Sequence, residues 1–355
     1  MEILDKYIGK QVVLTILLVA FMLLGFDLFF SLVNELKMVG RGDYTLGVAL
    51  IFLILSIPGR LYSMFPWAAL IGTLICMGAL ANHSELVVMR TSAISIFRIT
   101  CSVLKAALIL ILGIVLVGEG IAPIAERFAQ NKKTAAISGG QTVQTPLGLW
   151  VRHGQEFIHV QTVRNDGKLL GVTRYQFDKN RQLMEALYAE SAEQEDGRWR
   201  LTDVKSTRFS DKKTQAFQEK TKFLPQLLEP EILETAMIKH PERLSLFALW
   251  RTIQHRVKNE LNTENYQLAF WSKIFQPVVI LMMVFLAVPF VFGPLRSVST
   301  GFRIVVGILT AFLFHTVNHL FAPLAVVYQV PAIIAVLTPI MVFGGFGFWM
   351  LKRRQ

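Results

Sequence analysis

The sequence lacks the motifs from which many catalytic and nucleotide-binding sites are built. It contains no GxxxxGK[ST] loop to hold nucleotide phosphates, and no HExxH or GxSxG motif to indicate hydrolysis. It has only two cysteines, Cys76 and Cys101, whose spacing fits neither a disulfide framework nor a metal motif. We therefore expect no cofactor and no metal in this chain.

Charged residues are also scarce, and their scarcity favours a membrane protein. They make up 17% of the 355 residues, whereas hydrophobic residues make up 53%. The net charge of +11 does not indicate nucleic-acid binding, because Lys and Arg are scattered around apolar stretches instead of forming one basic face interleaved with aromatics. The composition predicts an integral membrane protein.

Six windows are long and apolar enough to cross roughly 30 Å of hydrocarbon as helices. Residues 304–351 carry no charge and are too many for one crossing, so the turn-like APLAVVYQVP separates the last two spans. The apolar run before Pro58 is interpreted as the start of a long, kinked second helix and not as a seventh span. The predicted spans are 11–33, 61–82, 99–122, 274–295, 304–320 and 332–351.

Basic residues predict which side of the membrane each loop faces. With six spans, most of them fall in the termini and in the loops on the same side, which the positive-inside rule assigns to the cytoplasm. The long insert after the third span then faces outward. The inner set is Lys6, Lys10, Arg90, Arg98, Lys105, Arg296, Arg303, Lys352, Arg353 and Arg354.

The insert between about 126 and 265 has a different pattern. Short alternating runs such as EFIHVQTV and GVTRYQF, separated by turns such as Asn-Asp-Gly, predict antiparallel strands in a sandwich or rolled sheet. Apolar residues then recur at helical spacing from 245 to about 261, which indicates an amphipathic connector. We expect three spans in 1–125, a β domain in 126–244, and the connector with three more spans in 245–355.

Three polar side chains within the spans are candidate functional residues. Asp27 would cost about 2.5–3.5 kcal/mol near the bilayer centre, so it should face protein or a wet cavity, and an interhelical hydrogen bond explains it slightly better than a substrate path. His315 and His319 share one helix face, but with no third ligand a hydrogen-bonded pair is favoured over zinc. A membrane-embedded lipid-modifying enzyme using these three residues is one alternative function.

Four motifs resemble the lipopolysaccharide-export permease family, LptF/LptG. They are LDKYIGK at the start, HSELVVMRTSAIS between spans two and three, YQLAFWSKIFQP before span four and VFGPLRSVSTGFR after it. The resemblance covers nearly the whole chain, and the last two motifs look more like LptG than LptF, which remains the close alternative. It implies a periplasmic β-jellyroll domain and the inner membrane of a Gram-negative bacterium.

The resemblance implies a transporter subunit that is not itself an enzyme. Such a subunit extracts lipopolysaccharide from the outer leaflet of the inner membrane and passes it to a periplasmic bridge. ATP and Mg would be bound by the partner ATPase. The implied partners are an LptF-like permease, an LptB-like ATPase dimer, an LptC-like single-span protein, an LptA-like bridge, lipopolysaccharide and membrane lipid, with no nucleic acid.

The resemblance also implies three groups of site residues. The segment at about 83–95, which alone would be interpreted as a plain interfacial connector, becomes a coupling helix for the ATPase, with Ala93 where relatives often have Gly. Basic residues near the outer face would meet lipid phosphates, with ordinary snorkelling as the alternative. Spans one and five would form lateral gates. The groups are Glu85, Leu86, Val87, Met89 and Arg90 for coupling; Asp27, Lys37, Arg41, Arg60, Lys132 and Lys133 for lipopolysaccharide; and Phe26, Phe30, Phe312, His315 and His319 for the gate.

Overall fold

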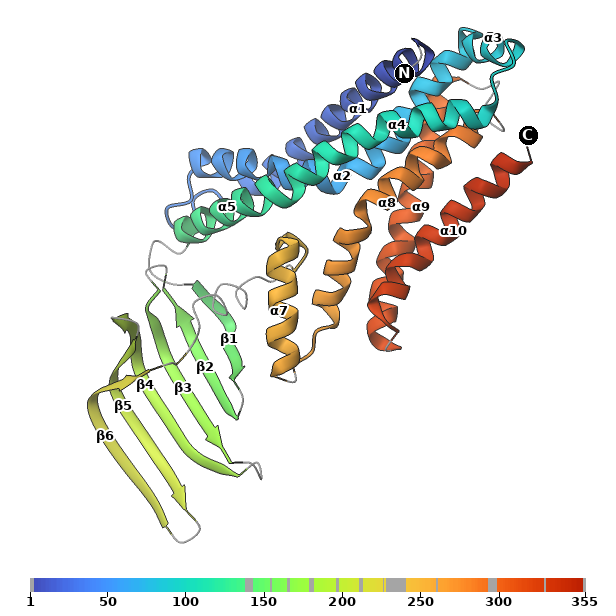
Figure 1. The fold of residues 1–355 in the computed structure, drawn as a ribbon. Helices are drawn as coiled ribbons and strands as arrows, with labels where there is room; N and C mark the ends of the chain where they lie inside the picture. The colour runs from blue at the N-terminus through green and yellow to red at the C-terminus, as the bar shows by residue number, and fades with distance from the viewer. Residues whose placement is uncertain are drawn as a thin grey trace.

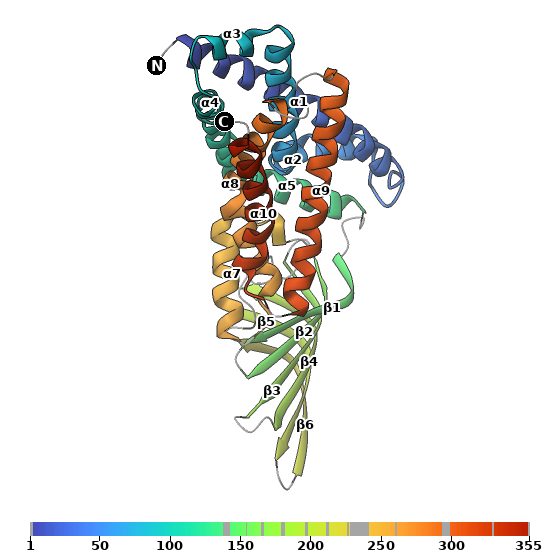
Figure 2. The same ribbon diagram turned by 90° about the vertical axis from the view of Figure 1, so that its right-hand side faces the viewer.

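The computed structural model consists of a long helical region with a β sheet at one end (Figure 1). Both chain ends and the short helix α3 (Glu85–Thr91) lie at the opposite end of the molecule from the sheet, as a second view also shows (Figure 2). The structure describes residues 3–137, 143–153, 155–164, 167–178, 182–195, 198–210, 213–225, 227, 241–259, 261–292, 299–328 and 330–353.

Six long helices coincide with the six predicted spans. Five of them, including the continuous helix Ile96–Ile137, are long and apolar enough to cross a membrane, and α9 contains a described apolar stretch at Ile304–Asn318. Their side chains pack into one shared core. Helices can span a membrane in this way because each satisfies its backbone hydrogen bonds internally and packs against its neighbours. The helices are α1 (Ile3–Leu36), α2 (Leu46–Asn82), α4 (Ile96–Leu116), α8 (Glu264–Phe292), α9 (Thr300–Val327) and α10 (Ala332–Lys352).

Helix α2 is a single helix of 37 residues, so the prediction of no seventh span is confirmed. Pro58 and Pro66 lie inside it, and each removes one backbone donor from the helix. Gly72 allows α2 to approach α1, because a Cβ added there would lie 2.7 Å from the Cα of Ile16. The α1–α2 pair therefore packs as a close unit.

The helix that contains the predicted third span, 99–122, continues beyond residue 125. Helix α4 continues through a π-helical turn, η1 (Val117–Ile121), into α5 (Ala122–Ile137). Such π turns are rare and frequently lie at functional sites. Gly118 in this turn packs against the ring of Tyr62, where a side chain would clash. The chain leaves the helical region only after Ile137.

The insert folds as one six-stranded antiparallel sheet with its strands in chain order, which confirms the predicted β domain between the third and fourth spans. Gly171 and Asp203 have positive φ angles of 62° and 50°, and the pairing skips both residues. Lys222 on the last strand approaches Glu185, two strands away, at 3.8 Å, so the sheet is rolled. The strands are β1 (Val143–His153), β2 (Glu156–Val163), β3 (Leu169–Phe177), β4 (Leu183–Glu195), β5 (Arg198–Ser210) and β6 (Lys213–Leu224).

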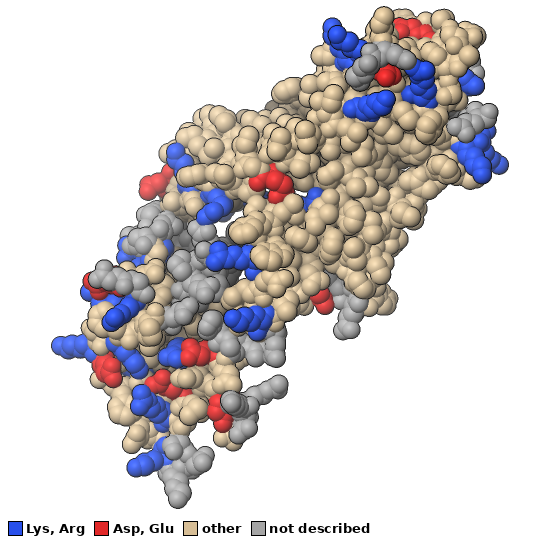
Figure 3. Space-filling view, viewed as in Figure 1, with Lys and Arg blue, Asp and Glu red and all other residues tan. Residues whose placement is uncertain are grey.

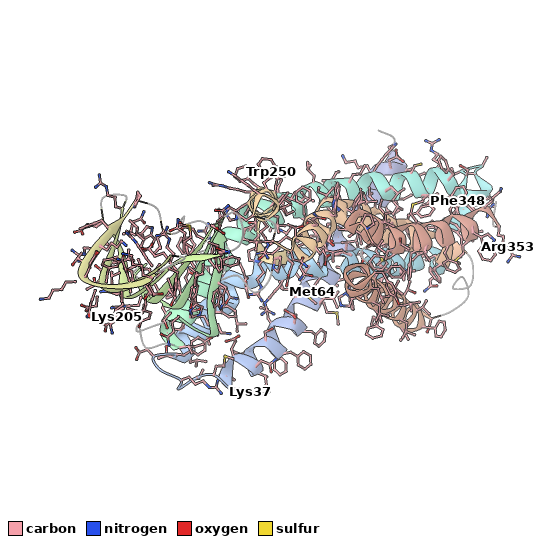
Figure 4. All side chains as sticks on the ribbon, turned by 90° about the horizontal axis from the view of Figure 1, so that it is seen from below. Lys37, Met64, Lys205, Trp250, Phe348 and Arg353 are labelled. Carbon is pink, nitrogen blue, oxygen red and sulfur yellow. The ribbon has the colours of Figure 1, made fainter. Side chains whose placement is uncertain are left out.

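The inner face of the rolled sheet is apolar, with Ile158, Leu169 and Leu187 fully buried. Helix α7 (Leu246–Lys258) follows the sheet and packs beside α8. The predicted amphipathic connector is present, because Leu249 is buried whereas Trp250 is half exposed and points away from the bundle (Figure 4).

Candidate functional site

A cavity of about 980 Å³ lies between α1, α2, the η1–α5 segment, α8, α9 and α10. Its wall mixes apolar and charged side chains. Figure 3 shows the setting: most of the helical region is free of charge, and acidic and basic atoms reappear where it meets the β domain. The wall includes Asp27, Phe52, Arg60, Met64, Glu126, Glu242, Arg243, Leu268, Lys273, His315 and Val336.

Arg60 joins α2 to α1 on this wall. Its guanidinium donates from Nη1 to Asp27 and Ser31, and from Nε to Ser56 Oγ at 2.8 Å. The ion pair is partly open to the cavity, since the Asp27 side chain keeps 32% of its exposure. The structure thus brings together two residues predicted for lipid binding, and it gives the acidic residue of the first span a partner within its own chain.

Lys133 is also held by a carboxylate of its own chain. Its Nζ lies 2.6 Å from Glu35 Oε1 and 4.4 Å from the centre of the Phe52 ring. The Tyr44 hydroxyl donates to the other oxygen of Glu35 at 2.6 Å. Burial, followed by the hydrogen bond to Glu35, raises the pKa of Tyr44, so this hydroxyl remains a donor at physiological pH. Sequence reasoning missed Glu35 altogether.

The other predicted lipid-binding cations are exposed. Lys37, Arg41 and Lys132 lie on the surface near the loop that joins α1 to α2 and on the neighbouring α5. Figure 4 shows Lys37 at the tip of α1, and its Nζ donates to Asn34 Oδ1 at 3.3 Å. The basic residues near this end therefore form two sets, one exposed and one bonded to carboxylates.

A partly buried ion pair in the π-helical turn was not predicted. Glu119 Oε1 lies 2.9 Å from Lys273 Nζ of α8, and Glu119 Oε2 accepts a hydrogen bond of 2.8 Å from the backbone N–H of Leu246. The signal was present in the sequence, because Glu119 is an acidic residue inside the predicted span 99–122. This pair joins three elements: the third span, α7 and α8.

Helix α3 divides the predicted coupling residues between two faces. Leu86 and Met89 are buried in the helical core, whereas Val87 and Arg90 are exposed. Glu85 accepts a hydrogen bond of 2.9 Å from the hydroxyl of Tyr7 in α1. The outward face also includes Val88, which the sequence analysis did not single out.

The end of α3 shows why glycine suits the position of Ala93. The N–H of Ile94 donates to Met89 O, and that of Ala93 to Arg90 O, both at 3.1 Å. This pattern is a Schellman cap, whose central residue adopts the left-handed conformation that favours glycine. Ala93 has a φ of 60°, so an L side chain stands in a glycine-favouring position.

The predicted gate residues are exposed on α1 and α9. Phe26, Phe30 and Phe312 are each more than half exposed within the single chain. His315 contacts the ring of Trp67 edge-on, with the centroids 5.3 Å apart. The side chain of His319 lies outside the described residues. Within the residues that the structure describes, no three His, Cys, Asp or Glu side chains gather as a metal site.

Comparison with known proteins gives the family. Residues 6–353 match the profile of the lipopolysaccharide export system permease LptF/LptG. This chain belongs to the LptF/LptG family. It is 36% identical over 361 residues to the lipopolysaccharide export system permease protein LptG of Escherichia coli K12, and 34% identical over 354 residues to that of Haemophilus influenzae. Both alignments cover 99% of each chain.

Both of these relatives are LptG proteins, which supports the predicted similarity to LptG over LptF. The LptF/LptG proteins are permeases, so the chain is a transporter component rather than an enzyme, which argues against the lipid-modifying alternative. Together with its apolar helices, this makes the chain a multi-pass protein of the inner membrane.

Proposed function

We propose that this chain is the LptG-type permease subunit of a transporter that extracts lipopolysaccharide from the outer leaflet of the inner membrane and passes it to a periplasmic bridge. The observation that carries the proposal is the cavity of about 980 Å³, whose wall combines apolar side chains with Arg60 and Arg243. A phosphorylated lipid has both kinds of surface, and such a wall can accept both. ATP hydrolysis on a partner subunit drives the transport cycle.

Both termini face the cytoplasm and the β domain faces the periplasm. The distribution of basic residues supports this orientation, because they gather at the end of the helical region where α3 and both chain ends lie (Figure 3). That end carries, among others, Lys6, Lys10, Arg90, Lys105 and Arg353.

Helix α3 is the contact with an LptB-like ATPase dimer, which binds ATP and Mg. Its exposed Val87, Val88 and Arg90 form the contact face, and the buried Leu86 and Met89 fix the helix to the core. A rigid attachment is needed for this role, because a loosely held helix would absorb the movement of the ATPase. Glu85 passes this movement to α1 through its hydrogen bond with Tyr7.

Lipopolysaccharide meets the exposed Lys37, Arg41 and Lys132 first. Arg60 and Lys133 then bind its phosphates by exchanging their carboxylate partners for phosphate oxygens, which accept charge-assisted hydrogen bonds as carboxylates do. The exposed phenylalanines of α1 and α9 form lateral gates against an LptF-like permease.

The rolled sheet receives the acyl chains on its apolar face. Strand β6 is at the sheet edge and is exposed along most of its length, so it can pair with a strand of an LptC-like or LptA-like partner. The β domain is thus the first segment of the periplasmic bridge.

Transfer in proteoliposomes tests the proposed function. The chain is reconstituted with its partner permease, ATPase and single-span protein in vesicles containing lipopolysaccharide, and transfer to a soluble LptA-like acceptor is measured. Transfer should require both ATP and this chain. Equal ATP-dependent transfer by vesicles prepared without this chain would refute the proposal.

A further inference from the structure

The segment that leaves the β domain forms part of the cavity wall. Residues 241–246, here called the exit segment, consist of the 3₁₀ turn η2 (Pro241–Arg243), the buried Leu244, and Ser245 and Leu246 at the start of α7. Pro241, Glu242 and Arg243 all line the cavity of about 980 Å³. The exit segment therefore borders the cavity and, in chain order, follows the β domain.

Two carboxylates of one continuous helix hold the exit segment. Glu126 Oε1 lies 2.7 Å from Arg243 Nη1, and Glu119 Oε2 accepts the backbone N–H of Leu246 at 2.8 Å. Glu119 and Glu126 are seven residues apart, or about two helical turns, so they lie on the same side of that helix. The contacts bind the exit segment to one surface at its middle, through Arg243, and at its end, through Leu246.

The two contacts differ in how easily they open. Glu119 also pairs with Lys273, whose side chain is almost fully buried, and the neighbouring Gly118 is packed against Tyr62, so this contact is fixed in the helical core. The two carboxylates are similarly covered, with Glu126 16% and Glu119 21% exposed, so the difference lies in their cations. Arg243 keeps 40% of its side-chain exposure, and an ion pair with one exposed partner contributes little stability. Leu246 is thus the fixed point of the exit segment, and Arg243 is the point that can be released.

We infer that the exit segment is a latch that closes the cavity toward the β domain and opens when the Arg243–Glu126 pair breaks. This inference rests on the proposed function, because a lipid must pass from the cavity to the rolled sheet. A lipid phosphate in the cavity offers Arg243 a replacement for the Glu126 carboxylate. The passing lipid itself therefore releases the latch, while Glu119 keeps the start of α7 in place as the pivot.

A reversible crosslink tests the latch in the complete transporter. Cys76→Ser and Cys101→Ser remove both native cysteines, and Glu126→Cys with Arg243→Cys is then bridged by a short, reducible bifunctional thiol reagent. A photo-crosslinking amino acid at Met64 reports lipid in the cavity, and one at Trp199 reports lipid in the core of the sheet. The control bridges Lys168→Cys to Glu193→Cys, the sites of an ion pair within the sheet.

The bridged latch should abolish ATP-dependent lipid crosslinking at Trp199 and leave crosslinking at Met64 intact, and reduction of the bridge should restore the first signal. The control bridge should change neither signal. Undiminished ATP-dependent crosslinking at Trp199 with the latch bridged would overturn the latch alone. Lack of lipid at Met64 before bridging would overturn both the proposed function and the latch that depends on it.

Charge exchange tests the same pair without a crosslinker. Glu126→Gln or Arg243→Gln should speed the arrival of lipid at Trp199 by about two- to fivefold. This is the change in rate expected when the stabilisation by one partly exposed ion pair is lost from the closed latch. Glu126→Arg combined with Arg243→Glu should return the rate toward that of the unaltered chain. The matched control is Glu195→Gln, which breaks an exposed pair with Arg200 in the sheet. Single variants with unaltered rates, or an exchange that restores nothing, would contradict the latch.

Discussion

Helix α1 is attached to the rest of the molecule at both ends, but by different chemistry. Near its N-terminus the short contacts are hydrogen bonds, from Ser102 to Asp5 and from Tyr7 to Glu85 of α3, and the ion pair of Asp5 with the exposed Lys105 is long at 3.9 Å. Near its C-terminus, carboxylates of α1 form ion pairs, Asp27 with Arg60 and Glu35 with Lys133. The whole of α1 has 34 residues, about 50 Å, and contains no proline.

The difference suggests two roles for one rigid element. Ion pairs with carboxylates can be exchanged for contacts with a lipid phosphate, whereas a hydrogen bond between neutral Tyr7 and Glu85 offers no such exchange. The N-terminal attachment is therefore suited to transmit movement, and the C-terminal attachment to recognise lipid. The following experiments test this division, beginning with the largest expected effect.

Removal of the transmitting carboxylate should have the largest effect. Glu85→Ala deletes the hydrogen bond that links α3 to Tyr7 of α1, so lipid-stimulated ATP turnover by the purified complex should be almost completely lost. The far-UV circular dichroism of the complex should not change. Tyr7→Phe removes the same hydrogen bond from the side of α1, so it should lower lipid-stimulated turnover to a similar extent.

The control for Glu85 is Glu190→Ala, an exposed acidic residue on β4 that lies far from α3. It should turn over ATP like the unaltered chain. If Glu85→Ala also retained full lipid-stimulated turnover, α3 would not be the transmitting element.

Loss of one partner at the lipid end should cost stability. Arg60→Gln leaves the Asp27 carboxylate without its cation in the first span, and because both side chains are partly exposed we expect a loss of about 1–2 kcal/mol in unfolding free energy. The double variant Arg60→Gln with Asp27→Asn should recover most of it. Thermal unfolding in detergent measures both, and additive effects of the two substitutions would argue against the pair.

Charge reversal of an exposed cation should act on lipid binding and not on stability. Lys37→Glu should lower photo-crosslinking of lipopolysaccharide by about fivefold, the limit for one exposed charge contact. Lys205→Glu, on an exposed position of the sheet (Figure 4), provides the comparison. Equal reductions for the two variants would favour ordinary snorkelling of Lys37 at the membrane surface.

The smallest effect is expected at the end of α3. Ala93→Gly removes the side chain from a left-handed position. We expect the free energy of unfolding to rise by about 0.5–1 kcal/mol, because the relief of strain exceeds the entropy cost of glycine. The midpoint of thermal unfolding should rise slightly with no change in ATP turnover. A lower midpoint would show that the Ala93 methyl group contributes packing that outweighs its strain.

The six spans and the β insert could be predicted because they depend on local properties. An apolar window of bilayer length and an alternating strand pattern both lie within short stretches of chain. The role of helix α3 could not be predicted from such local patterns, because seven residues of mixed polarity indicate no function alone. Its interpretation as a coupling helix came from the resemblance. Which residues of α3 face inward, Leu86 and Met89, became clear only from the packing.

The ion pairs could not be predicted, since sequence does not say which distant charges meet. Asp27 and Arg60 are 33 residues apart, and Glu35 and Lys133 are 98 apart. Glu119 was detectable as an acidic residue in a span, but its partners are not, because one lies 154 residues further along and the other is a backbone N–H. The π-helical turn that carries Glu119 has no pattern of its own in the sequence.

The central claim is that the cavity beside Arg60 carries the lipid, and its most direct test is photo-crosslinking at Met64 during the ATP cycle. The measurement uses the complete complex in vesicles containing lipopolysaccharide, before and after addition of ATP. We expect strong crosslinking to lipopolysaccharide without ATP and a clear decrease when ATP and an acceptor allow the lipid to leave. Crosslinking at Met64 that is absent, or that does not respond to ATP while transfer proceeds, would contradict the claim.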